Sequence, residues 1–120
     1  MIPYGRHDLS DEDIQAVVKV LRSDSLTQGP VVPEFERSIS EICGSHFAVA
    51  MNSATSTLHA ACVALGLGPD DLMWTSPITF VASANSALYC GANVDFVDID
   101  PKSYNISIAA LTEKLHLADK

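Results

Sequence analysis

Short apolar segments alternate with helix-length segments over most of this chain, and no other feature constrains its fold as strongly. The apolar runs 46–51, 72–76 and 93–98 have the length of strands, and segments 55–65 and 80–89 between them have helical character. Parallel strands require crossover connections, usually helices, and the helices then cover the faces of the sheet. We therefore expect an α/β fold in which a three-stranded parallel sheet is covered on both faces.

Helices are also predicted on either side of this alternating region. Ser10 precedes three acidic residues, which predicts a helix from Asp11 to about Arg22. A loop rich in proline and glycine leads to a second amphipathic helix that Gly44 ends, and Ser107 is expected to cap a last helix. In the helix at 55–65 the residues expected to face inward are Leu58, Ala61, Cys62 and Leu65.

Composition excludes some classes of partner. The 120 residues carry a net charge of −8, with only seven Lys and Arg, which do not cluster. Nucleic-acid binding surfaces are basic, so we expect no nucleic-acid partner. No apolar window approaches the length of a membrane span and no targeting signal is visible at the start, so we expect no membrane partner and a cytoplasmic location.

Small and hydroxyl-bearing residues from Asn52 to Thr57 lie where an apolar run turns into a helix. Free N–H groups and the helix dipole at such a terminus attract anions, and small residues let a phosphate approach the backbone. A second strand-to-helix junction carries the aromatic residue Phe80. Together they suggest a cofactor with a phosphate and a flat ring, although an ordinary helix cap and a core phenylalanine explain the same residues.

Other polar residues give weaker signals. Asp98 and Asp100 form a DxD pattern that serves metal and nucleotide-sugar binding in glycosyltransferases, but aspartate before Pro101 also opens turns. His59 follows Thr55 by one helical turn and could approach a pocket, or simply pack. The three widely spaced cysteines are expected to be reduced, packed thiols. These are Cys43, Cys62 and Cys90.

Several motifs in order resemble the N-terminal portion of the DegT/DnrJ/StrS-type nucleotide-sugar aminotransferases, which are fold-type I pyridoxal-phosphate enzymes. The motifs are Arg6, Leu26–Pro30, Asn52–Thr57, Ala64–Gly68, Pro77–Ser83 and Phe96–Asp100. The segment Leu72–Pro77 is most similar to the branch that aminates a UDP-linked 4-keto-6-deoxy-N-acetylhexosamine on the pseudaminic acid pathway. The resemblance implies that residues 1–120 are an incomplete N-terminal segment of the cofactor-binding large domain.

The resemblance also implies roles for individual residues. Ala54 and Thr55 would hold the phosphate of pyridoxal 5'-phosphate, and Phe80 would stack on its pyridine ring. Thr27 and Gln28 would line the sugar side of the pocket. A UDP-sugar substrate, an amino acid donor, expected to be glutamate, and a homodimer are implied for the full-length protein.

No catalytic residue is expected within this chain. In the family the Schiff-base lysine lies beyond the position that corresponds to residue 120. The lysines present, Lys19, Lys102, Lys114 and Lys120, do not match it, so the segment alone is expected to be inactive. Two alternatives remain: a sugar dehydratase or non-catalytic relative of the same family, and a DxD-type binding module for nucleotide sugar or metal.

Overall fold

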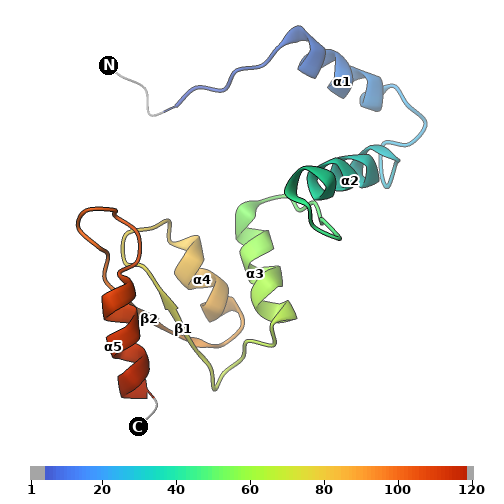
Figure 1. The fold of residues 1–120 in the computed structure, drawn as a ribbon. Helices are drawn as coiled ribbons and strands as arrows, with labels where there is room; N and C mark the ends of the chain where they lie inside the picture. Colours follow the sequence, from blue (N-terminus) through green and yellow to red (C-terminus); the bar gives the residue numbers. More distant parts are fainter. Residues whose placement is uncertain (1–4, 119–120) are drawn as a thin grey trace. The chain divides into compact units, whose positions relative to one another are not determined.

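The computed structural model describes residues 5–118 and divides the chain into two compact units, residues 1–50 and 51–120 (Figure 1). Within the described residues, no helix combines the length and the apolar character needed to cross a bilayer.

The first unit contains two helices, α1 (Asp11–Leu21) and α2 (Val31–Cys43). Ser10 and Asp13 close a reciprocal capping box at the start of α1, as its sequence predicts. Gly44 ends α2 with a φ of 64°, a left-handed conformation that glycine adopts without a steric penalty. Both predicted helices of this unit are confirmed.

The predicted strand at 46–51 is wrong. The segment is irregular, and Phe47 and Val49 are 88% and 70% exposed. A strand needs a neighbour with which to exchange backbone hydrogen bonds, and no described residue provides one. The segment is instead held at its end by the N–H of Ala50, which donates to Glu36 Oε1 at 2.8 Å.

The second unit alternates helices and strands as expected. Its elements are α3 (Ala54–Ala64), β1 (Leu72–Thr75), α4 (Ala82–Tyr89), β2 (Asn93–Phe96) and α5 (Ile108–Ala118). The strands pair in parallel, with Leu72 opposite Asn93 and Thr75 opposite Phe96, and α4 forms the crossover between them. The α/β fold with parallel strands is confirmed, but among the described residues the sheet has two strands rather than three.

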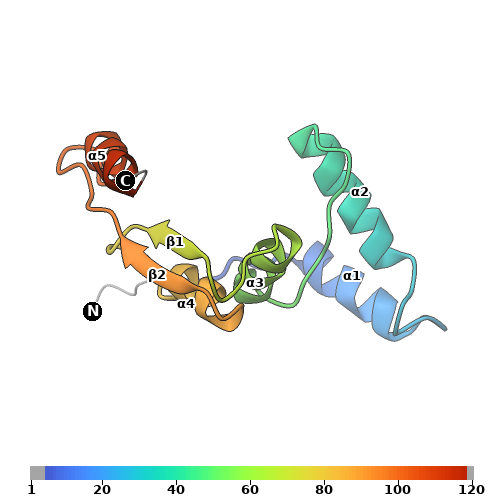
Figure 2. The same cartoon turned by 90° about the horizontal axis from the view of Figure 1, so that it is seen from below.

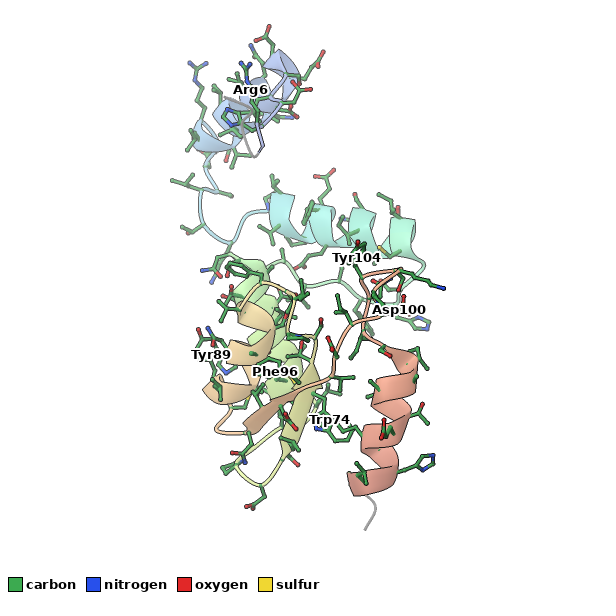
Figure 3. The ribbon with its side chains drawn as sticks, turned by 90° about the vertical axis from the view of Figure 1, so that its left-hand side faces the viewer. Arg6, Trp74, Tyr89, Phe96, Asp100 and Tyr104 are labelled. Carbon is green, nitrogen blue, oxygen red and sulfur yellow. The ribbon has the colours of Figure 1, made fainter. Side chains whose placement is uncertain are left out.

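Helices α4 and α5 lie on opposite faces of the two-stranded sheet (Figure 2). Trp74 of β1 faces α5, where the ammonium group of Lys114 lies 5.3 Å from its ring centroid (Figure 3). The Lys114 ammonium also forms an ion pair with Asp95 and donates to the Phe96 carbonyl at 2.7 Å. This pairing lowers the pKa of Asp95 below its ordinary value, because Lys114 hydrogen-bonds to the carboxylate.

The buried core is small and lies under α4. Its apolar members are Ala82, Ala87, Ala92 and Val97. The expectation that Leu58, Ala61 and Leu65 face inward is wrong, because all three are exposed, and Leu65 is 87% exposed. Cys62, the fourth residue of that prediction, is half-buried. Helix α3 packs on α4 along one side, and no described residue covers the side that carries Leu65.

Candidate functional site

The N-terminus of α3 is organised by hydroxyl groups. The Ser53 hydroxyl accepts from the N–H of Ser56 at 3.1 Å, and the two hydroxyls lie 3.0 Å apart. The Ser56 hydroxyl donates to Asn52 Oδ1 at 2.8 Å. The first helical hydrogen bond runs from the N–H of Thr57 to the Ser53 carbonyl at 3.1 Å. Ser53 and its neighbours therefore satisfy the N–H groups of the third and fourth positions of the helix.

The first two positions of α3 keep their donors free. Within residues 5–118, no acceptor bonds to the N–H of Ala54, to the N–H of Thr55 or to the Thr55 hydroxyl. We call these three groups the α3 donor group. The first turn contains no acidic residue, so the positive end of the helix dipole is not neutralised by its own sequence. Ala54 is exposed and Thr55 half-buried, so an anion can reach both.

Phe80 lies in the segment that leads into α4. It is 75% exposed, and its carbonyl accepts from the N–H of Ser83 at 3.1 Å. The predicted helix at 80–89 therefore begins two residues later, at Ala82, and Phe80 stands before it. The core-packing alternative for this phenylalanine is wrong in the described structure.

The α3 donor group and Phe80 belong to neighbouring elements. Helices α3 and α4 pack side by side, and their first turns lie at the same end of the pair (Figure 1). A phosphate suits the donor set, because backbone N–H groups and a hydroxyl at a helix N-terminus bind phosphate oxygens. An exposed aromatic ring suits a flat apolar group. The chemistry of these residues therefore fits a phosphorylated ring compound.

Thr27 and Gln28 lie in the loop between α1 and α2, in the first unit, and both are exposed. Gln28 has a φ of 54°, a conformation that non-glycine residues seldom adopt. Next to it, a Cβ on Gly29 would meet the Ser25 carbonyl oxygen at 2.5 Å, so this tight turn requires glycine. Strained conformations of this kind cluster at binding sites, but the role of Thr27 and Gln28 in sugar binding stays a prediction.

The two residues of the DxD pattern have structural partners. Asp100 Oδ1 accepts from the N–H groups of Lys102 and Ser103, at 2.9 and 2.8 Å. These backbone hydrogen bonds lower the pKa of Asp100 below its ordinary value. Asp98 Oδ1 accepts from the N–H of Ile99 at 2.7 Å. The geometry is that of a turn, and no cluster of three potential metal ligands occurs in the part of the chain that the structure describes.

Two contacts between elements were not expected from the sequence. His59 of α3 lies against Tyr89 of α4, with ring centroids 5.4 Å apart, so this histidine packs between helices. Lys114 joins α5 to the sheet through Asp95 and Trp74. Each pair is distant in sequence. The only sequence signal for the lysine contact is a cation on an otherwise apolar helix face.

Comparison with known proteins identifies the family. Residues 7–118 match the model of the DegT/DnrJ/EryC1/StrS aminotransferase family, and the chain belongs to this family. It is 44% identical over 99 residues to UDP-4-amino-4,6-dideoxy-N-acetyl-beta-L-altrosamine transaminase from Campylobacter jejuni, a match that covers 82% of this chain and 26% of the relative. The chain therefore spans about a quarter of the length of that protein.

Solved structures share the fold. Spr1654 from Streptococcus pneumoniae, in its PLP-form, superposes with a TM-score of 0.89 at 31% identity, over 93% of this chain and 29% of that one. Helicobacter pylori PseC, an aminotransferase involved in the biosynthesis of pseudoaminic acid, gives a TM-score of 0.86 at 36% identity, over 92% and 30%. The α/β unit described above is thus the fold of the corresponding part of aminotransferases of this family.

Proposed function

We propose that the full-length protein is a pyridoxal 5'-phosphate-dependent aminotransferase acting on a nucleotide-linked keto sugar. Residues 1–120 would form the N-terminal segment of its cofactor-binding large domain. The observation that carries the proposal is the α3 donor group, whose N–H groups and hydroxyl are free within residues 5–118, in a chain that belongs to an aminotransferase family.

Three residues would hold the cofactor. The N–H groups of Ala54 and Thr55 and the Thr55 hydroxyl would donate to the phosphate, and the helix dipole would add to the attraction. Phe80 would stack on the pyridine ring and fix its plane. When bound, pyridoxal phosphate supplies an electron sink for carbanion chemistry at the amino-bearing carbon. The residues of this chain would supply binding and orientation.

The proposed substrate is a UDP-linked 4-keto-6-deoxy-N-acetylhexosamine, with glutamate as amino donor. The similarity to the altrosamine transaminase and to PseC supports this choice, and a role in pseudaminic acid or related polysaccharide biosynthesis goes with it. Thr27 and Gln28 would contact the sugar. The protein would act in the cytoplasm, where nucleotide sugars are made.

None of the lysines in the described residues suits the covalent attachment of the cofactor. Lys19 is exposed on α1, Lys102 is exposed in the turn after Asp100, and Lys114 is engaged by Asp95 and the Phe96 carbonyl. A lysine that attacks a carbonyl must be aimed at it and must lose its proton readily. We therefore propose that the attaching lysine lies in the remainder of the protein and that residues 1–120 alone are inactive.

A homodimer is part of the proposal. The strands β1 and β2 form a sheet of only two strands, whose outer edges no described residue covers. Open strand edges and exposed apolar side chains favour association with further polypeptide. Size-exclusion chromatography with light scattering on the full-length protein would measure its molar mass and so test whether it is a dimer.

The cofactor assignment is tested by titrating the full-length protein with pyridoxal 5'-phosphate and with pyridoxal. We expect tighter binding of the phosphorylated compound by at least about 100-fold, since two hydrogen bonds to a charged group, at about 1.5 kcal/mol each, already amount to about 3 kcal/mol. The variant Phe80→Ala should weaken both compounds to a similar degree. Equal affinity of the wild type for the two compounds would contradict the phosphate site.

The reaction is tested by incubating the loaded enzyme with the keto sugar and glutamate. We expect an aminated sugar and one molecule of 2-oxoglutarate for each amine formed. A dehydrated sugar without consumption of glutamate would indicate the dehydratase alternative within the same family. If a divalent metal raised the melting temperature and pyridoxal phosphate did not, the DxD alternative would replace the proposal.

A further inference from the structure

Helices α3 and α4 are in direct contact along one side, and this contact brings two cysteines together. The ring of His59 on α3 meets the ring of Tyr89 on α4 at a centroid distance of 5.4 Å. Cys62 lies one helical turn beyond His59, on the same face of α3, and Cys90 directly follows Tyr89. Both cysteines therefore lie close to this ring pair, near the contact between α3 and α4.

The two thiols lie near enough to influence each other, because Cys62 acts electrostatically on the Cys90 thiol. Both residues are half-buried, so small reagents can reach them. Burial raises the pKa of the Cys90 thiol, and repulsion from the nearby Cys62 raises it further. No other described cysteine has such a neighbour: Cys43 is exposed at the end of α2, in the other unit.

We propose that Cys62 and Cys90 are a dithiol pair that closes to an intramolecular disulfide by exchange with low-molecular-weight disulfides such as oxidised glutathione. One cysteine thiolate attacks the external disulfide and forms a mixed disulfide, which releases one glutathione thiolate. The other cysteine thiolate then attacks the protein sulfur of the mixed disulfide and releases the second glutathione. Two cysteine thiols are oxidised, one external disulfide is reduced, and the two cysteine protons end on the two released thiols.

The disulfide would tie together the two helices that precede and follow β1. Helix α3 carries the α3 donor group, and α4 begins directly after Phe80. A bond between Cys62 and Cys90 at the far ends of both helices would restrict their sliding and separation. The formation of the bond depends only on the α3–α4 contact, so it can be tested without reference to any bound cofactor.

The test uses the full-length protein with Cys43 replaced by serine. This replacement is needed because a protease that cuts before aspartate leaves Cys43 and Cys62 together in peptide 24–69, whereas Cys90 lies in peptide 71–94. The protein is incubated with oxidised glutathione, blocked with an alkylating reagent, digested and analysed by mass spectrometry. We expect peptides 24–69 and 71–94 to be joined, with the loss of two hydrogen atoms, and to separate after reduction.

Two controls distinguish a native pair from chance oxidation. The variants Cys62→Ser and Cys90→Ser should each keep one glutathione on the remaining cysteine, because the partner thiol is missing. In urea-unfolded protein the link should form at least tenfold more slowly than in the native protein, since proximity is lost. Stable mixed disulfides on native protein that has both cysteines, or equal rates in native and unfolded protein, would overturn the proposal.

Discussion

Helices α1 and α3 are both capped by a serine, but the first turn of α1 is negatively charged and the first turn of α3 is not. Both have a serine cap whose hydroxyl accepts from the N–H three residues later, from Asp13 in α1 and from Ser56 in α3. In α1 the carboxylate of the third residue, Asp13, accepts a hydrogen bond from the N–H of Ser10. The first turn of α1 contains three acidic residues. In α3 the corresponding residue is a serine and no acid is present.

The difference shows that a serine cap alone does not define an anion site. The carboxylates of α1 neutralise the positive end of its dipole and repel an approaching phosphate. The first turn of α3 is uncharged, and its cap leaves the N–H groups of Ala54 and Thr55 without partners among residues 5–118. Charge in the first turn therefore decides which of two similar helix starts is electrostatically suited to a phosphate.

The largest effect is expected when α3 receives the negative charge that α1 already has. The variant Thr55→Glu should weaken pyridoxal phosphate binding to the full-length protein by about 100-fold, or about 2.8 kcal/mol, through repulsion and loss of the hydroxyl. The matched control is Ala109→Glu, at the second position of α5, which also follows a serine cap. Fluorescence titration should show unchanged binding for this control. Equal losses would mean that net charge rather than position matters.

A smaller effect is expected when only the Thr55 hydroxyl is removed. Thr55→Val should reduce affinity by about tenfold, since one hydrogen bond to a charged group is worth about 1.5 kcal/mol. Thr112→Val in α5 is the control, because its hydroxyl donates to the Ile108 carbonyl at 2.8 Å and faces no proposed ligand. Calorimetric titration with pyridoxal phosphate measures both. An unchanged affinity for Thr55→Val would remove the hydroxyl from the α3 donor group.

Removal of either serine cap should lower the free energy of unfolding by a similar amount, but only removal of the α3 cap should lower the affinity for pyridoxal phosphate. Ser10→Ala and Ser53→Ala should each lower the free energy of unfolding by about 1 kcal/mol, measured by urea denaturation without cofactor. Only Ser53→Ala should also weaken pyridoxal phosphate binding, by a few fold, because the first turn of α3 becomes less ordered. If Ser10→Ala weakened binding as much, the distinction between the two helix starts would fail.

The smallest effect concerns pH. Backbone and hydroxyl hydrogen bonds from Ser10 lower the pKa of Asp13 in the folded protein. Because the folded pKa lies below the unfolded value, the ionised carboxylate stabilises the fold above the ordinary aspartate pKa of about 3.9, and this is lost as pH falls through the folded pKa. Asp13→Asn should therefore be less stable than wild type at neutral pH and equal to it in acid. Urea denaturation at neutral and at acidic pH measures this difference, and equal stability of the two proteins at neutral pH would contradict it.

Local sequence signals predicted most of the secondary structure. The Ser10 cap, the Gly44 stop and the Ser107 cap each depend on neighbouring residues only, and each is confirmed. The strand predicted at 46–51 failed, because apolar residues form a strand only if another strand lies beside them. The same dependence on distant residues explains why Leu58 of α3 and Leu65, directly after this helix, are exposed rather than buried.

The residues of the candidate site could be named from the sequence, and the motif pattern also indicated the family to which the chain belongs. The sequence by itself determined that a helix with small, hydroxyl-bearing residues begins near Ala54, because a cap and a first turn depend on neighbouring residues. The assignment of Ala54 and Thr55 to a phosphate came from the resemblance to the family. Tertiary structure alone decided that α3 lies beside α4, that His59 meets Tyr89, and that Lys114 reaches Asp95. These contacts join segments far apart in the chain, and only the packing of helices and strands sets such distances.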